Sequence, residues 1–212
     1  MNYLVLLNGL PPDKSLCQKL AADADSVICV DGALNYAYEY GIQPDIMLGD
    51  MDSADPNFLN KLAPDTTIIR HCPIKDETDF ELAINYASEN GASKLTVLGF
   101  SGGRIDQSIA NIMLFLRAWR IGIAIDARDT NQRLFICEGP VTVSARKGDT
   151  FSVFPMAEGI RISLKNGLFY PLDKYELKTD QPIGVSNVMT ADKADIDSDG
   201  PVLVIITEAA NV

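Results

Sequence analysis

The chain has 212 residues, of which 47% are hydrophobic and 22% are charged, which suits one large or two small folded domains and argues against disorder. The net charge of -11 argues against binding to nucleic acid or anionic lipid, and no run reaches the roughly 20 apolar residues of a membrane span. Four cysteines without a CxxC pair, and an apolar start without a basic leader, predict a cytoplasmic protein.

Up to about Asp129, short β-branched runs alternate with longer segments of helical period, which is typical of a parallel α/β sheet. The expected strands are Tyr3–Leu7, Ser26–Val30, Ile46–Leu48, Thr66–Ile69, Lys94–Leu98 and Ile121–Ile125. The expected helices are Asp13–Ala22, Ala33–Tyr40, Thr78–Glu89 and Asp106–Arg120, with Gly41 and Gly91 placed to end two of them.

The second half contains short extended runs separated by Gly, Pro and Asp turns, which predicts an all-β structure. The expected strands are Arg133–Cys137, Val141–Ser144, Phe151–Phe154, Ile160–Leu164 and Val202–Ile206. The polar segment Asp126–Asn131 is the natural boundary, so we expect an α/β domain over residues 1–130 and a β domain over 131–212.

Charged and glycine-rich loops follow four successive strands of the predicted sheet. Because the carboxyl ends of parallel strands meet at one edge, which is where ligands usually bind, we expect these loops to converge. They are Asp31–Ala33, Gly49–Ser53, Lys75–Asp79 and Gly99–Asp106.

Asp50 and Asp52 lie two residues apart, so a locally extended backbone would point both carboxylates the same way. Magnesium prefers one or two carboxylates, with water and phosphate oxygens filling the remaining positions. A turn in which each aspartate bonds its own backbone explains either residue alone. The convergence of four loops favours the metal site.

Thr78 is a suitable N-cap for the third helix, and Asp79 would interact favourably with the helix dipole. That explanation leaves Lys75 and Asp76 unaccounted for, at the mouth of a helix terminus that could hold phosphate. The turn Ser101–Arg104 would bring backbone amides and a planar guanidinium to an anion. It matches neither a Walker A loop nor GxGxxG, and a single histidine, His71, argues against a zinc site or a Ser-His-Asp triad.

These loops, in this order, resemble those of the thiamine pyrophosphokinase family. The matching stretches of the first half are Val30–Asn35, Gly49–Ser53, Lys75–Glu81, Gly102–Gln107 and Ala110–Ile112, and those of the second half are Gly148–Ser152, Gly167–Leu172 and Gly184–Asn187. The resemblance covers essentially the whole chain. It implies a Rossmann-like catalytic domain followed by a β-sandwich, and a homodimer whose active sites lie between subunits.

The implied reaction converts ATP and thiamine to AMP and thiamine diphosphate with Mg²⁺ as cofactor. In the resemblance, Asp50, Asp52 and Asp79 hold the metal, and together with Arg104 they make up the catalytic set. The implied ATP-binding residues are Asp31, Gly32, Lys75, Asp76, Thr78, Arg104, Asp106 and Gln107. The implied thiamine-binding residues are Tyr170, Ser186 and Asn187, with Val188 standing where many members carry an acidic residue.

Two other functions remain open on the residues alone. The same carboxylates would suit a magnesium-dependent phosphohydrolase that activates water in place of an alcohol. A non-catalytic nucleotide-binding or sensor module would also explain the acidic loops. Neither accounts for the matching stretches of the second half.

Overall fold

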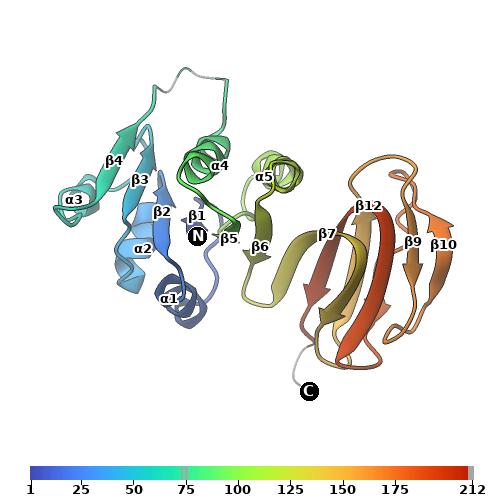
Figure 1. Ribbon diagram of the computed structural model, residues 1–212. Coiled ribbons are helices and arrows are strands. Elements are labelled where there is room, and N and C mark those ends of the chain that lie inside the picture. The colour runs from blue at the N-terminus through green and yellow to red at the C-terminus, as the bar shows by residue number, and fades with distance from the viewer. Residues whose placement is uncertain (73, 75, 210–212) are drawn as a thin grey trace. The chain divides into compact units, whose positions relative to one another are not determined.

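The structure is a computed structural model that describes residues 1–72, 74 and 76–209. The fold is mixed α/β, and the chain divides into two compact units, Met1–Thr130 and Asn131–Val212 (Figure 1). No helix in the described part of the chain is long and apolar enough to cross a membrane.

The first unit alternates strands and helices along the chain. Its strands are β1 (Asn2–Leu6), β2 (Ser26–Val30), β3 (Ile46–Gly49), β4 (Thr67–Arg70), β5 (Lys94–Leu98) and β6 (Ala124–Arg128). Its helices are α1 (Lys14–Ala22), α2 (Ala33–Tyr40), α3 (Pro56–Leu59), α4 (Asp79–Glu89) and α5 (Ile105–Arg120). The strands form a parallel sheet in the order β4-β3-β2-β1-β5-β6.

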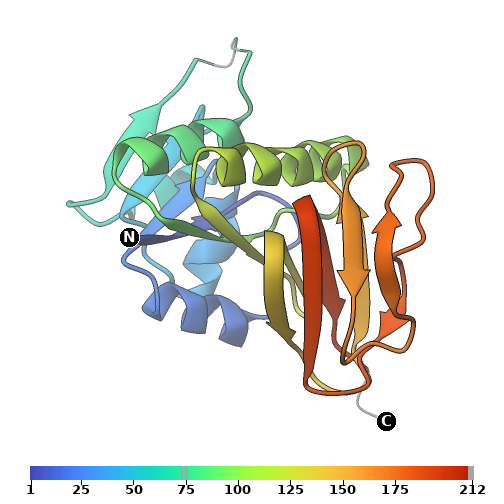
Figure 2. The same cartoon turned by 45° about the vertical axis from the view of Figure 1, so that its right-hand side comes forward.

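Helices cover both faces of this sheet, with α1 and α2 on one side and α4 and α5 on the other (Figures 1 and 2). The central strands are therefore buried on both faces, and β1, β2 and β5 are almost uninterrupted apolar runs. Gly41, with a φ of 72°, caps α2 in the left-handed conformation that favours glycine.

Two elements of the first unit differ from the prediction. The strand expected at Ile121–Ile125 begins three residues later, because the chain first closes the end of α5: the Ile123 amide donates to the Ala118 carbonyl at 3.0 Å, and Gly122 has a φ of 85°. The short helix α3 was not expected. Asp55 caps it by accepting a 2.8 Å hydrogen bond from the Asn57 amide, and Pro56 occupies its first turn.

The second unit is built of antiparallel strands. They are β7 (Gln132–Ser144), β8 (Thr150–Pro155), β9 (Arg161–Leu164), β10 (Leu172–Glu176), β11 (Asn187–Val188) and β12 (Lys193–Thr207). The two strands expected at Arg133–Cys137 and Val141–Ser144 are a single strand, since β7 continues through Gly139 with a φ of 74°. The charged strand β10 and the two-residue strand β11 lack the apolar run that predicts a strand.

The long strand β12 organises the second unit. It pairs with β7 along both of its halves, and on its other edge Val202–Thr207 pair with β8 whereas Ile196–Ser198 pair with β9. The change of partner occurs where the register shifts between Ser198 and Val202. A single strand thus belongs to two sets of neighbours, which enclose an apolar core that includes Phe151, Ile162 and Val204.

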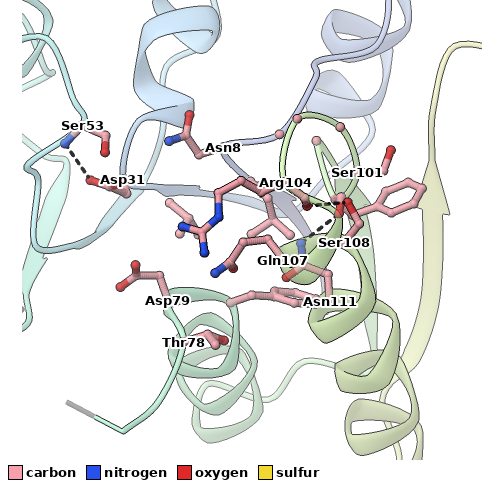
Figure 3. A pocket seen from close by; sticks show the side chains of 18 of the residues that line it. Asn8, Asp31, Ser53, Thr78, Asp79, Ser101, Arg104, Gln107, Ser108 and Asn111 are labelled. Carbon is pink, nitrogen blue, oxygen red and sulfur yellow. Dashed lines mark hydrogen bonds between the residues drawn. The ribbon is translucent and has the colours of Figure 1, made fainter.

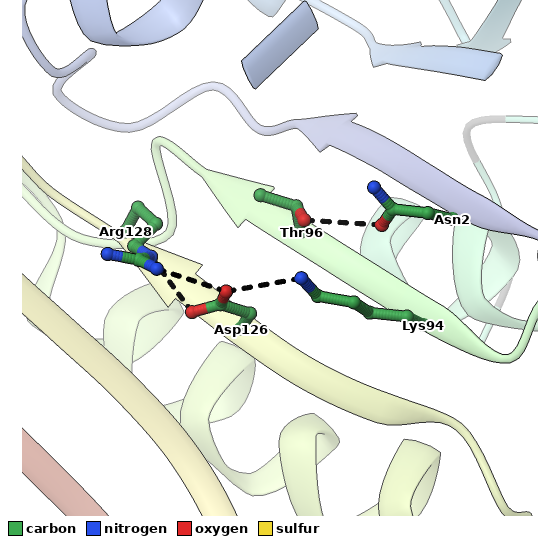
Figure 4. A network of polar contacts seen from close by, with 5 residues as sticks. All are labelled: Asn2, Lys94, Thr96, Asp126 and Arg128. Atoms are coloured by element: carbon green, nitrogen blue, oxygen red, sulfur yellow. Dashed lines mark hydrogen bonds and ion pairs between the residues drawn. The ribbon is translucent and has the colours of Figure 1, made fainter. Parts of the chain in front are cut away.

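A buried carboxylate joins β5 and β6 in the first unit (Figure 4). Asp126 is 5% exposed, and it pairs with Lys94 at 3.3 Å and with Arg128 at 2.8 Å. A buried charge is tolerated only when it is paired and hydrogen-bonded, so these two cations make the site possible.

We predict that Asp126→Ala lowers the free energy of unfolding by about 2 kcal/mol, because hydrogen bonds to a buried charged group are lost. The matched control is Asp197→Ala, which removes an exposed pair with Lys165 at 3.4 Å and should cost less than about 0.5 kcal/mol. Urea unfolding followed by circular dichroism measures both. Equal losses in the two variants would contradict the stabilising role of the Asp126 pairs.

Candidate active site

The order of the parallel strands creates a crevice at the carboxyl ends of β1 and β5. The chain leaves β1 toward β2 on one side, and it leaves β5 toward β6 on the other, so the direction of the strand order reverses at this point. A pocket of about 510 Å³ occupies this position (Figure 3). Its lining residues are Leu7–Gly9, Val30, Asp31, Asp50, Asp52, Ser53, Thr78–Phe80, Gly99–Arg104, Gln107, Ser108 and Asn111.

Glycines allow the loops after β1 and β5 to run side by side in close contact. The Gly9 amide donates to the Gly99 carbonyl at 2.9 Å. A Cβ on Gly9 would lie 2.3 Å from the Gly99 oxygen, and a Cβ on Gly99 would lie 2.2 Å from the Leu7 oxygen. Since real Cβ atoms do not approach oxygen so closely, any side chain at either position would push the two loops apart.

Three aspartates form the acidic side of the pocket. One carboxylate oxygen each of Asp31, Asp50 and Asp52 lies within 4.8 Å of the others. Asp31 reaches this position with a φ of 48°, and Met51, between the other two, has a φ of 67°. Such left-handed conformations are uncommon outside glycine, and aspartate is among the side chains that tolerate them best. Hard carboxylate oxygens at this spacing suit Mg²⁺.

The hydrogen bonds of the loop after β3 hold these carboxylates. Asp50 Oδ1 accepts from the Asp52 amide at 3.1 Å, so its role as a turn former coexists with its place at the pocket. The Ser53 amide donates to Asp31 Oδ1 at 3.5 Å, which joins the loops after β2 and β3. Asn35 of α2 donates to the Ser53 carbonyl at 3.0 Å and thereby supports the same loop.

Burial raises the pKa of Asp31 above its usual value, and the negative charge of Asp52 acts in the same direction. Hydrogen bonds from Ser53 and from the Gly32 amide oppose this effect. Ionisation of Asp31 is therefore less favourable in the folded protein without a cation than in the unfolded chain. A bound cation would reverse that preference, which is the behaviour expected of a metal ligand.

The N-terminus of α4 brings Thr78 and Asp79 to the pocket. The Thr78 hydroxyl caps the helix by accepting from the Glu81 amide at 3.2 Å, as predicted, and Asp79 lines the pocket beside it (Figure 3). Asp76 is exposed and does not line the pocket, and Lys75 lies outside the described residues. The carboxylate grouped with Asp50 and Asp52 is that of Asp31, which the sequence placed in the nucleotide pocket.

The N-terminus of α5 brings Arg104 and Gln107 to the opposite side. In Figure 3 the guanidinium of Arg104 extends into the space between Asp31 and Asp79. Arg104 Nε donates to Asp106 Oδ1 at 3.2 Å, and a hydrogen bond from Arg104 lowers the pKa of Asp106. Asp106 is not among the lining residues. Its contact is with the guanidinium, so its effect on an anionic ligand would be exerted through Arg104.

Several lining residues were not predicted as ligand contacts. Asn8 and Gly9 lie in the loop after β1, and the dipeptide Asn-Gly directly after the expected strand Tyr3–Leu7 is the signal that would have found them. Ser108 and Asn111 lie one helical turn apart on α5. The Asn111 amide donates to the Phe100 carbonyl at 2.8 Å, which fastens the loop after β5 to the helix. Gly32 does not line the pocket, because it packs beneath Asn8.

The predicted thiamine-binding residues lie in the second unit. Tyr170 and Ser186 are exposed, whereas Asn187 is 4% exposed. The Asn187 side chain bonds the backbone of Tyr170, so at least two of the three residues are adjacent.

Models of two known protein domains match the chain, one in each half of the sequence. The model of the thiamin pyrophosphokinase catalytic domain matches residues 17–126, and that of the thiamin pyrophosphokinase vitamin B1 binding domain matches residues 140–203. The chain belongs to the thiamin pyrophosphokinase family. This is a family of enzymes, and the match extends over both halves of the sequence.

Curated relatives carry the same family name. The chain is 26% identical over 165 residues to thiamine pyrophosphokinase of Bacillus subtilis (strain 168), with 76% of each sequence covered. It is 24% identical over 207 residues to thiamine pyrophosphokinase 1 of Oryza sativa subsp. japonica, with 83% of this chain and 76% of the relative covered.

Solved structures share the fold. The crystal structure of thiamine pyrophosphokinase from Bacillus subtilis superposes with a TM-score of 0.83 at 20% identity and covers 100% of both chains. Thiamin pyrophosphokinase from Candida albicans also gives a TM-score of 0.83, at 19% identity, covering 98% of this chain and 89% of that one. At these identities the likeness establishes the fold alone.

We predict that Asp31→Asn makes the metal-free protein more stable at neutral pH, by on the order of 2 °C in melting temperature. Because the folded pKa is raised, ionised Asp31 costs stability above that pKa, and the cost disappears as the pH falls below the unfolded value near 3.8. Melting curves in EDTA between pH 3.5 and pH 7.5 should therefore converge at the acidic end. If the variant were less stable than the parent at pH 7.5, the ionised Asp31 carboxylate would not destabilise the metal-free protein, and the prediction would be wrong.

Proposed function

We propose that the protein is a thiamine pyrophosphokinase, which transfers the pyrophosphoryl group of ATP to the hydroxyl of thiamine and releases AMP. The observation that carries the proposal is a pocket at the switch between β1 and β5 that is acidic on one side and contains Arg104 on the other. This arrangement suits a polyphosphate bound together with a divalent cation, and the two family models match residues 17–126 and 140–203.

Mg²⁺ is the proposed cofactor, and the donor chemistry of the pocket fits it. The residues that would hold it are Asp50, Asp52 and Asp79, as the resemblance implies, together with Asp31, whose carboxylate lies within 4.8 Å of the first two. When bound, Mg²⁺ supplies the positive charge that neutralises the polyphosphate. An all-oxygen site of this kind gives no reason to invoke a softer metal.

The residues around the polyphosphate would act by positioning and by charge. The turn before α5 has glycines at φ values of 106° and 66°, which let its backbone approach phosphate oxygens, and the N-cap residue Arg104 makes no side-chain hydrogen bond to the helix amides. Arg104 would pair with the transferred group, whose charge is greatest in the transition state. Asp79 is our first choice to accept the proton of the thiamine hydroxyl, because it lies in the pocket at the start of α4.

The remaining nucleotide contacts follow the sequence prediction. We assign Asp31, Gly32, Asp76, Thr78, Asp106 and Gln107 to the ATP site. Of these, Asp31, Thr78 and Gln107 line the pocket. Asp106 would act through Arg104, and Gly32 would act by leaving space for Asn8. Lys75 remains part of the proposal on the resemblance alone.

We propose further that the first unit is Rossmann-like and the second is a β-sandwich. The parallel order β4-β3-β2-β1-β5-β6, with helices on both faces, supports the first assignment (Figure 2). The division of β12 between β8 and β9 supports the second, because a strand that bends at a bulge can take part in two layers. The four cysteines are all free, which agrees with a reducing cytoplasm as the proposed compartment.

A homodimer with active sites between subunits is the proposed assembly. Three apolar side chains at four-residue spacing lie exposed on α5: Ile105 at 76%, Ile109 at 49% and Met113 at 65%. This face begins at the same helix terminus that brings Arg104 to the pocket. A second copy of the chain is the proposed cover for this face, and the active sites shared between subunits are carried over from the resemblance.

The reaction itself is tested by incubating the pure protein with ATP, Mg²⁺ and thiamine. We expect AMP to form only when thiamine is present, with thiamine diphosphate in equal amount. Inorganic phosphate released without thiamine would identify a phosphohydrolase. ATP binding without any turnover would identify a sensor.

We predict that Asp52→Asn lowers kcat by roughly a thousandfold, equivalent to about 4 kcal/mol of transition-state stabilisation, while the affinity for thiamine changes little. The matched control is Asp55→Asn, which changes an aspartate of the same loop that lies outside the pocket lining and caps α3. Steady-state AMP formation and thiamine titration measure the two effects. Near-normal turnover in Asp52→Asn would rule out its metal role.

We predict that an inactive Asp50→Asn protein and an inactive Ser186→Trp protein regain activity when mixed. If each site takes residues from two subunits, a heterodimer retains one site with neither substitution, so about half of the sites in each heterodimer would work. Activity is assayed after joint refolding of differently tagged chains and purification of the mixed species. Verified heterodimers without activity would place each site within one chain.

A further inference from the structure

Asn187 is a buried side chain whose amide is fully engaged by backbone groups. Its Oδ1 accepts from the amide of Tyr170 at 2.9 Å and from the amide of Val188 at 2.9 Å. Its Nδ2 donates to the carbonyl of Tyr170 at 2.7 Å. The side chain is therefore occupied in fixing the neighbouring segment, although the resemblance placed it among the thiamine contacts.

These bonds prolong a short antiparallel pairing. Leu168 forms a bridge with Met189, and the Phe169 amide donates to the Val188 carbonyl at 3.0 Å. At the next position the amide and carbonyl of Tyr170 meet the side chain of Asn187 in place of a backbone partner. Because β11 pairs with β8 on its other side, the segment 168–170 is anchored to the main body of the unit.

The anchored segment presents two exposed aromatic rings. Phe169 is 62% exposed and Tyr170 is 60% exposed, and their ring centroids lie 4.8 Å apart at an interplanar angle of 78°. Nothing in the described core holds these rings, so their placement depends on the backbone beneath them. Ser186, just before Asn187, is held in a left-handed conformation with a φ of 59°, and its amide donates to Ser152 Oγ at 3.0 Å.

An edge-to-face pair of exposed rings suits a ligand that is both aromatic and cationic. Ring faces attract a positive charge, and a pair at a steep angle offers one face and one edge to a flat ring system. Thiamine has a cationic thiazolium ring and an aromatic pyrimidine. The chemistry of Phe169 and Tyr170 therefore fits the proposed substrate better than it fits the polyphosphate end of ATP.

We propose that Asn187 is a positioning residue for thiamine, which acts by holding the backbone of Tyr170 so that the Phe169–Tyr170 pair meets the substrate in a fixed orientation. The inference rests on the proposed function. A fixed orientation lowers the entropic cost of binding, so loss of the Asn187 bonds weakens thiamine binding even when both rings remain. If Asn187 instead contacted thiamine directly, its effect would be independent of Tyr170.

A double-mutant cycle separates these two roles. Tyr170→Ala, Asn187→Ala and the double variant are compared by the KM for thiamine, the KM for ATP and kcat. We expect each single change to raise the thiamine KM about tenfold and to leave the ATP KM within about twofold, and the double variant to be within about twofold of the worse single variant. Effects that multiply to about a hundredfold would overturn the inference.

Two further variants serve as controls. Asn166→Ala removes the side chain of another asparagine of the same unit, which is exposed and bonds Asp195 at 2.9 Å, so it measures the effect of losing an asparagine remote from the Tyr170 contact. If Asn187→Ala fails to fold, the cycle is run with Asn187→Asp, which keeps an acceptor for the Tyr170 amide but replaces the donor to its carbonyl with a negatively charged oxygen. Melting curves establish that each variant is folded.

The same variants distinguish failure of the inference from failure of the proposed function. If the parent forms AMP with thiamine but Tyr170→Ala leaves the thiamine KM unchanged, the inference is wrong and the function stands. If the parent forms no AMP, the proposed function is wrong. Calorimetric titration with thiamine then measures the thiamine affinity of the parent, the two single variants and the double variant, so the cycle can still be completed. Non-additive losses of thiamine affinity support the positioning role, and additive losses or no binding by the parent overturn it.

Discussion

The close approach of the loops after β1 and β5 is the constraint on which the site depends. Gly9 and Gly99 meet through a 2.9 Å backbone hydrogen bond, at a distance that leaves no space for a Cβ on either residue. The loops stay joined beyond this point, since the Leu10 amide donates to the Ser101 carbonyl at 2.8 Å, and residues of both loops line the pocket. The other lining residues come from the acidic loops after β2 and β3 and from the N-termini of α4 and α5.

The acidic side of that pocket lowers the stability of the metal-free protein, although the same carboxylates suit a bound cation. Asp31 is buried, adopts a left-handed backbone and lies near two other carboxylates, and each of these features costs free energy in the metal-free protein. The hydrogen bonds that the loop after β3 makes with Asp31 and α2 hold the arrangement together. A bound cation would offset the repulsion among the three carboxylates, so cation binding would stabilise the folded protein.

The sequence predicted much of this arrangement, because its strongest signals are local. Buried parallel strands are apolar runs, and the caps of α2 and α4 are a glycine and a threonine in their usual places. The grouping of Asp31 with Asp50 and Asp52 was not predictable, since it depends on strand order in space and on a positive φ. The role of Asn187 was hidden for the same kind of reason: its partner, Tyr170, lies 17 positions away along the chain.

The pairing of β12 has a consequence for the order in which the protein forms during synthesis. All strands of the first unit precede Thr130, so that unit can fold as soon as its own segment has left the ribosome. In the second unit, β7, β8 and β9 all pair with β12, which follows them in the chain. Those strands must wait, with unpaired edges, until the last strand of the unit arrives. The unit that contains the pocket can thus form before the second unit, whose unpaired strand edges are open to aggregation in the interval.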